Sequence, residues 1–82
     1  MDSATIDFIN ENSGERAELE VPLTITANDM IDALNISYGL GLNKEDYSNY
    51  YMCMENPIAF FRGERTLEEL GVRNGSQIIY KR

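Results

Sequence analysis

The stretch that decides the fold of this chain is its closing segment, GERTLEELGVRNGSQIIYKR, residues 63–82. Thr66 is a favoured N-cap residue and Glu69 follows it at capping-box spacing, which predicts one or two helical turns that the next glycine ends. Asn74-Gly75 is a turn signal, and the apolar run after it predicts a final strand over residues 77–81. The segment therefore predicts a capped helical turn followed by the last strand of a sheet.

The first 22 residues predict a β-hairpin. Apolar side chains alternate with polar ones over residues 4–10 and again over residues 17–21, which is the period of a strand with one buried face. The polar stretch between them contains Gly14, which can take positive φ in a turn. Pro22 ends the second strand because it cannot donate a hydrogen bond to a ladder.

A single helix is predicted to follow this hairpin. Thr26 is the N-cap candidate, and Asp29 occupies the reciprocal position of a capping box. The apolar stripe of the helix repeats at three- and four-residue spacing, at Ala27, Met30, Ile31, Leu34 and Tyr38. Gly39 supplies a positive-φ stop after about three turns. Residues 39–49 predict a loop with a short helical turn around residues 44–47.

The remaining chain predicts two more strands before the closing segment, at residues 50–54 and 58–61. The resulting order is hairpin, helix, two strands, helical turn and last strand. This is the plan of an α+β domain in which one helix packs across one face of a mixed sheet of about five strands. The first and last strands are the natural central pair. We expect residues 1–82 to form a single domain, since a chain of 82 residues has too little interior for two cores.

Composition excludes several classes of function. The chain has 7 Lys and Arg against 14 Asp and Glu, a net charge of -7, which disfavours nucleic acid and anionic membrane surfaces as partners. With no His and one Cys, it lacks a zinc ligand set and a Cys-His pair, so we expect no metal, no cofactor and no catalytic residues. The N-terminus lacks the pattern of a signal peptide, and no apolar run is long enough to cross a bilayer. We therefore expect a cytoplasmic protein.

The element order and the motif in GERTLEELGVRNGSQIIYKR resemble the ubiquitin-like β-grasp superfamily over nearly the whole chain. The pattern L-x-E-L-G-V-x-N-G-S is most similar to the YukD/EsaB family of small bacterial proteins associated with type VII secretion. The resemblance implies a non-catalytic adaptor or accessory protein of a WXG100 secretion system that works through protein contacts. Two alternatives stay open: an accessory subunit of a multicomponent enzyme, and a ubiquitin-like domain excised from a larger secretion component.

Conjugation is a separate expectation. Ubiquitin-like modifiers react through a C-terminal Gly-Gly, which passes through a narrow enzyme channel because it has no side chains. The 82-residue sequence ends in IIYKR, whose bulky side chains cannot replace two glycines. We therefore expect no covalent conjugation, unless the native chain continues past Arg82.

Alternation also predicts a docking patch on the sheet face away from the helix. Phasing the first strand by its buried positions turns Ile9 outward, and the same argument turns Ile79 outward in the last strand. In the third strand, free cysteine is among the most buried residue types, so Cys53 is predicted to be a buried structural thiol with Tyr51 beside it in the core. The predicted protein-binding set is then Ile9, Tyr50, Met52, Met54 and Ile79, with Lys81 on its rim.

Two alternatives to this patch remain. The third strand could have the opposite phase, with Met52 in the core and Tyr51 exposed, or Lys81 could interrupt the apolar surface.

Overall fold

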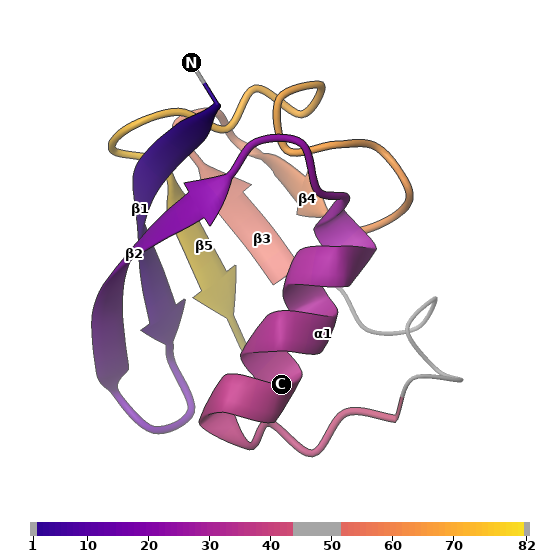
Figure 1. Ribbon diagram of the computed structural model, residues 1–82. Coiled ribbons are helices and arrows are strands. Elements are labelled where there is room, and N and C mark those ends of the chain that lie inside the picture. Colours follow the sequence, from indigo (N-terminus) through magenta and orange to yellow (C-terminus); the bar gives the residue numbers. More distant parts are fainter. Residues whose placement is uncertain (1, 44–51, 82) are drawn as a thin grey trace.

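A computed structural model of the protein describes residues 2–43 and 52–81 (Figure 1). The elements follow the predicted order, and the expected helical turn at residues 44–47, with residues 50 and 51 of the expected third strand, lies outside the described residues. The strands and the helix are β1 (Ser3–Asn10), β2 (Glu15–Pro22), α1 (Ala27–Tyr38), β3 (Met52–Glu55), β4 (Ala59–Phe61) and β5 (Gln77–Tyr80).

The strands form one mixed sheet in the order β2-β1-β5-β3-β4. The first and last strands of the chain lie side by side, as the sequence predicts, and the structure shows that they run parallel, whereas the other neighbours are antiparallel. α1 lies across one face of the sheet (Figure 1). The architecture is therefore the α+β plan predicted from the element order, with β5 in the middle of the sheet.

The predicted capping box fixes the start of α1. The Asp29 N–H donates to Thr26 Oγ1 (3.1 Å), and the Thr26 N–H donates back to Asp29 Oδ2 (3.2 Å). At the other end Gly39 is left-handed, with φ 59° and ψ 45°, and its N–H donates to the Asn35 carbonyl. A side chain with a Cβ rarely adopts this backbone, which is why a glycine ends the helix.

The closing segment forms the second capping box. The Thr66 N–H donates to Glu69 Oε1 (3.0 Å), and the Glu69 N–H donates to Thr66 Oγ1 (3.2 Å). The two capped turns contact each other, because Thr66 forms a β-bridge with Thr26 and the Ala27 N–H donates to the Arg65 carbonyl (3.0 Å). The segment is one hydrogen-bonded turn, and its role is to hold the start of α1 against the chain entering β5.

The core fills the space between α1 and the sheet. Alternate residues of β1 are buried, as are Ile78 and Tyr80 of β5, and Phe8 contacts Tyr38 of α1 with ring centroids 5.0 Å apart. The fully buried large apolar side chains are Phe8, Phe61, Ile6, Ile31, Met52, Met54, Leu67 and Ile78. Leu67 is among them, so the closing turn contributes to the core as well as to the cap.

The predicted phase of the third strand is wrong. Met52 and Met54 are 2% and 0% exposed, whereas Cys53 is an exposed free thiol. The reason is the register: Met54 lies opposite Ile78, whose side chain is in the core, so Met54 faces the core as well and Cys53 must face outward. The alternative phase, with Met52 in the core, is the one that the structure adopts.

Candidate docking face of the sheet

An apolar row crosses the outer face of the sheet, on the side opposite α1. Ile9 of β1 lies opposite Ile79 of β5, Ile79 lies opposite Cys53 of β3, and Cys53 lies opposite Phe60 of β4. Directly opposed residues on one sheet face have Cβ atoms about 5 Å apart, so the four side chains are neighbours. We call Ile9, Ile79, Cys53 and Phe60 the outer apolar row. Arg16 of β2 lies opposite Ile9 and marks the end of the row.

The predicted docking residues are distributed unevenly in the structure. Ile9 and Ile79 both lie on the outer face and are partly exposed, as predicted. Lys81 is exposed and follows Ile79 by two residues, which places it beside the row and not within it. Met52 and Met54 are core residues, so their prediction as docking residues is wrong. Tyr50 lies outside the described residues.

Two members of the row are absent from the set predicted by sequence. Cys53 is predicted to lie in the core because cysteine is usually buried. For the strand that contains Phe60, no inward or outward phase is predicted. Phe60 is 64% exposed, whereas Phe61 is fully buried. The sequence does contain a signal for Phe60, since adjacent residues of a strand face opposite sides and one of the two phenylalanines must therefore point outward.

A second row on the same face carries negative charge. Asp7 of β1 lies opposite both Glu18 of β2 and Gln77 of β5, and Gln77 lies opposite Glu55 of β3. We call Asp7, Glu18 and Glu55 the acidic row. Among the residues that the structure describes, none of these carboxylates forms an ion pair. The outer face therefore combines an apolar row with a parallel row of carboxylates that form no ion pair within residues 2–43 and 52–81.

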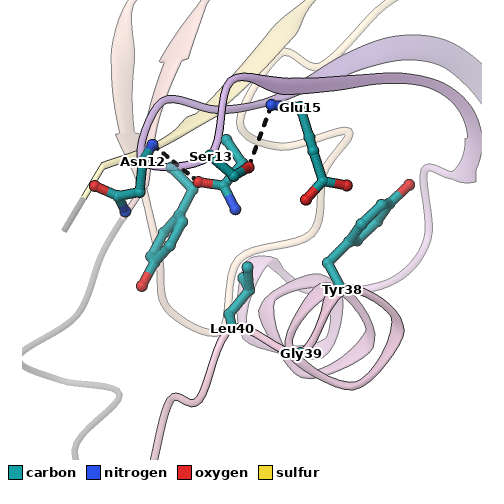
Figure 2. A pocket seen from close by; sticks show the side chains of 8 residues that line it. Asn12, Ser13, Glu15, Tyr38, Gly39 and Leu40 are labelled. Carbon is teal, nitrogen blue, oxygen red and sulfur yellow. Dashed lines mark hydrogen bonds between the residues drawn. The ribbon is translucent and has the colours of Figure 1, made fainter.

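A shallow pocket of about 550 Å³ lies at a different place, between the β1–β2 turn and the end of α1 (Figure 2). Local hydrogen bonds hold its turn: the Asn12 N–H donates to Asn10 Oδ1 (3.0 Å), the Gly14 N–H to the Asn10 carbonyl (2.8 Å) and the Glu15 N–H to Ser13 Oγ (3.2 Å). Of the described residues that line it, Glu15 supplies the one carboxylate, so the pocket offers no pair of carboxylates for acid-base catalysis. We assign these side chains to the structure of the turn.

One titratable group in the described part of the chain has a clearly shifted pKa. Glu69 is the group whose pKa is clearly shifted, below its ordinary value of 4.5, because of hydrogen bonds from the backbone and the side chain of Thr66 and the nearby charge of Arg65. This shift belongs to a capping box and so has a structural cause. Within residues 2–43 and 52–81, no group of three His, Cys, Asp or Glu side chains is placed to hold a metal ion.

Comparison with protein families decides the relationship of this chain. The family described as "WXG100 protein secretion system (Wss), protein YukD" matches residues 4–79, which include every helix and strand but the ends of β1 and β5. The chain belongs to the YukD family. It is thus a ubiquitin-like accessory protein of a WXG100 secretion system, as the closing segment indicated.

Solved structures similar to this YukD-family protein are ubiquitin-like folds. The ubiquitin-like domain of tubulin-binding cofactor B matches with a TM-score of 0.75 at 17% identity, covering 95% of this chain and 87% of that one. The C-terminal ubiquitin-like domain of mouse tubulin-specific chaperone e matches with a TM-score of 0.72 at 14% identity, covering 99% and 89%. Caldiarchaeum subterraneum ubiquitin gives 0.64 at 19% identity, covering 98% and 95%. At these identities the likeness establishes the β-grasp fold alone.

No curated protein matches the sequence of this YukD-family member. In the part of the chain that the structure describes, no helix is long and apolar enough to cross a membrane.

Proposed function

We propose that this YukD-family protein is a non-catalytic adaptor in the bacterial cytoplasm that supports WXG100 secretion by docking another component of the machine. The docking face is the outer apolar row, Ile9, Ile79, Cys53 and Phe60. The family match supports a role in WXG100 secretion, and the outer apolar row supports docking to another protein as the way in which this role is carried out. Apolar side chains gathered on the outer face of a sheet offer contact area to a protein partner.

One observation carries this proposal, namely that the row is continuous across four neighbouring strands. Scattered apolar side chains on a surface are common and need no explanation. Here Phe60 is 64% exposed and adjoins Cys53, which in turn adjoins Ile79. The core is already filled by Met52, Met54 and Ile78 on the other face, so packing within the domain does not require an apolar row on this one.

The test is secretion by a strain that lacks the gene and is complemented with variants. Ile79→Asp and Phe60→Asp are expected to abolish or strongly reduce the WXG100 substrates in the medium, because a carboxylate in the middle of an apolar contact must be desolvated. Ile36→Asp is the matched control, since Ile36 is 83% exposed but lies on α1. It should secrete like the wild type.

Affinity capture and thermal melts separate docking from folding in this test. Ile79 is in the central strand, so Ile79→Asp can lower stability, whereas Phe60 is in the edge strand β4, where a polar residue is tolerated better. The proposal requires a Phe60→Asp protein that melts near the wild type and no longer captures the secretion component. Normal secretion with both Ile79→Asp and Phe60→Asp would rule out this face.

A further inference from the structure

The strands that carry the outer face restrict what can bind there. β1, β5 and β3 each have a neighbour on both sides, so their backbone hydrogen-bonding groups are engaged within the sheet. A partner on this face receives side-chain contacts alone and must satisfy its own backbone groups. An α-helix does so, whereas an extended peptide would have to bind at a sheet edge.

The length of the outer apolar row suits a helix that lies across the strands. Neighbouring strands are about 4.8 Å apart, so the side chains from Ile9 to Phe60 extend over about 14 Å. A helix rises about 5.4 Å per turn, and an apolar stripe of nearly three turns covers the same length. The acidic row runs about 7 Å to one side, two residues away along each strand, where the flank of such a helix would lie.

Charge is distributed asymmetrically about the outer apolar row. The acidic row borders one side, while Lys81 lies beyond Ile79 on the other side and Arg16 stands at the β2 end. Asp7 and Glu18 are directly opposite each other in the ladder, an arrangement that destabilises a sheet. A cationic partner would neutralise these carboxylates on binding.

We propose that the outer apolar row and the acidic row together dock an amphipathic helix of a partner protein, with its apolar stripe on the row and Lys or Arg along the flank that faces Asp7, Glu18 and Glu55. This inference rests on the proposed function and adds the chemistry of the partner to it. Complementary charge beside an apolar contact fixes the orientation of the helix and accelerates encounter. A second copy of this chain is a poorer occupant, since each copy carries a net charge of -7.

The test uses designed peptides as probes. One is a fluorescein-labelled helical peptide of about 18 residues, with leucines at i, i+3, i+4 and i+7 and lysines along one flank, and its counterpart has glutamates in place of the lysines. Fluorescence anisotropy at about 150 mM NaCl keeps the long-range attraction to the whole acidic molecule screened. Chemical-shift mapping of the labelled protein identifies the surface that binds.

Two triple variants with the same change of net charge provide the matched pair. The face variant is Asp7→Lys, Glu18→Lys and Glu55→Lys, and the control variant is Asp2→Lys, Glu15→Lys and Glu68→Lys, whose side chains belong to other surfaces. The face variant is expected to weaken the lysine peptide at least roughly tenfold and to strengthen the glutamate peptide, while the control variant shifts either affinity less than about threefold. If the melting temperature of the face variant is much lower than that of the wild type, the Asp7→Asn, Glu18→Gln, Glu55→Gln protein replaces it. This protein should also bind the lysine peptide more weakly than the wild type does.

Several results would overturn the inference. Equal weakening in both triples would show attraction to the molecule as a whole, and shift changes away from the outer face would place binding elsewhere. A wild-type dimer in sedimentation that Ile79→Asp dissociates would assign the face to a second copy. In the secretion assay, loss of secretion with Ile79→Asp but normal secretion with the face variant would support the docking face. It would refute the proposal that the partner is a basic amphipathic helix. Normal export with Ile79→Asp and Phe60→Asp would instead refute the proposed function.

Discussion

Three consecutive residues of β3 serve opposite faces of the sheet. Met52 and Met54 face α1 and are buried, whereas Cys53 between them is exposed in the outer apolar row. Methionine is unbranched and fills irregular gaps, which suits the space under a short strand. The exposed thiol contributes to the outer surface without contributing to the core, so the three positions are expected to respond very differently to substitution.

We predict that Met54→Ala lowers the free energy of unfolding by about 2–5 kcal/mol, because it leaves a cavity at a fully buried position. Cys53→Ser, one residue away, should change it by no more than about 0.5 kcal/mol, since an exposed side chain loses little packing. Urea unfolding of both variants provides the measurement. A larger loss for Cys53→Ser than for Met54→Ala would contradict the observed phase of β3.

The two capped turns are the elements that join the helix to the sheet. Each has a threonine N-cap and an acidic residue three positions later, and the caps contact each other through the bridge between Thr26 and Thr66. The first turn starts α1, and the second precedes β5, so the pair fixes how the helix enters its position over the sheet. In the second turn, Glu69 also accepts from the hydroxyl of Thr66 (3.1 Å).

The capped turn of Thr66 and Glu69 predicts that the stability of the protein depends on pH. Hydrogen bonds from Thr66 hold the pKa of Glu69 below its ordinary value of 4.5 in the folded protein. A carboxyl with a depressed pKa contributes stability above the pKa of the unfolded chain and loses it as the pH falls through the folded value. Glu69→Gln keeps an acceptor but removes the charge. Its melting temperature should be lower than that of the wild type near about pH 7, and the difference should shrink as the pH falls below the ordinary value of 4.5.

Glu68→Gln is the control for this prediction. Its carboxylate is exposed and forms no hydrogen bond with the described residues. A Glu69→Gln difference that stays constant from neutral to acidic pH would show that the charge of Glu69 does not contribute through the capping box.

The whole molecule carries its acidic excess on several surfaces. Fourteen Asp and Glu against seven Lys and Arg produce a net charge of -7 in 82 residues. The facing carboxylates of Asp7 and Glu18 are one local instance of this excess. Self-repulsion of this kind opposes the compact state and disfavours anionic partners, while it favours a basic one.

We therefore predict that NaCl stabilises the protein. Raising the salt concentration from about 10 mM to about 150 mM shortens the screening length from roughly 30 Å to roughly 8 Å, so repulsion across a molecule of this size is weakened. We expect the melting temperature to rise by several degrees. The control triple Asp2→Lys, Glu15→Lys, Glu68→Lys should lose most of this dependence. A melting temperature that falls with added salt would show that attractive pairs dominate.

The order of elements, both capping boxes, the central pairing of the first and last strands and the membership of the YukD family were predictable from the sequence. The central pairing was inferred from the order of the elements. The elements and their caps depend on residues close together in the chain: the period of alternation, a threonine three positions before an acid, or a glycine at a positive-φ stop. Ile9 and Ile79 were predictable on the outer face for the same reason, since each lies in a strand whose core residues are unambiguous.

Tertiary structure alone decided which face each residue of β3 serves. The segment Met52–Glu55 is apolar at three successive positions, so its alternation does not specify a face, and the preference of cysteine for burial suggested the wrong one. The pairing of Met54 with Ile78 settles the phase, because a shift of one residue would turn every side chain of the strand over. The same long-range register brings Cys53 and Phe60 beside Ile79 and aligns Glu55 with Asp7 across Gln77. The docking face is therefore a product of contacts between strands that are distant in the sequence.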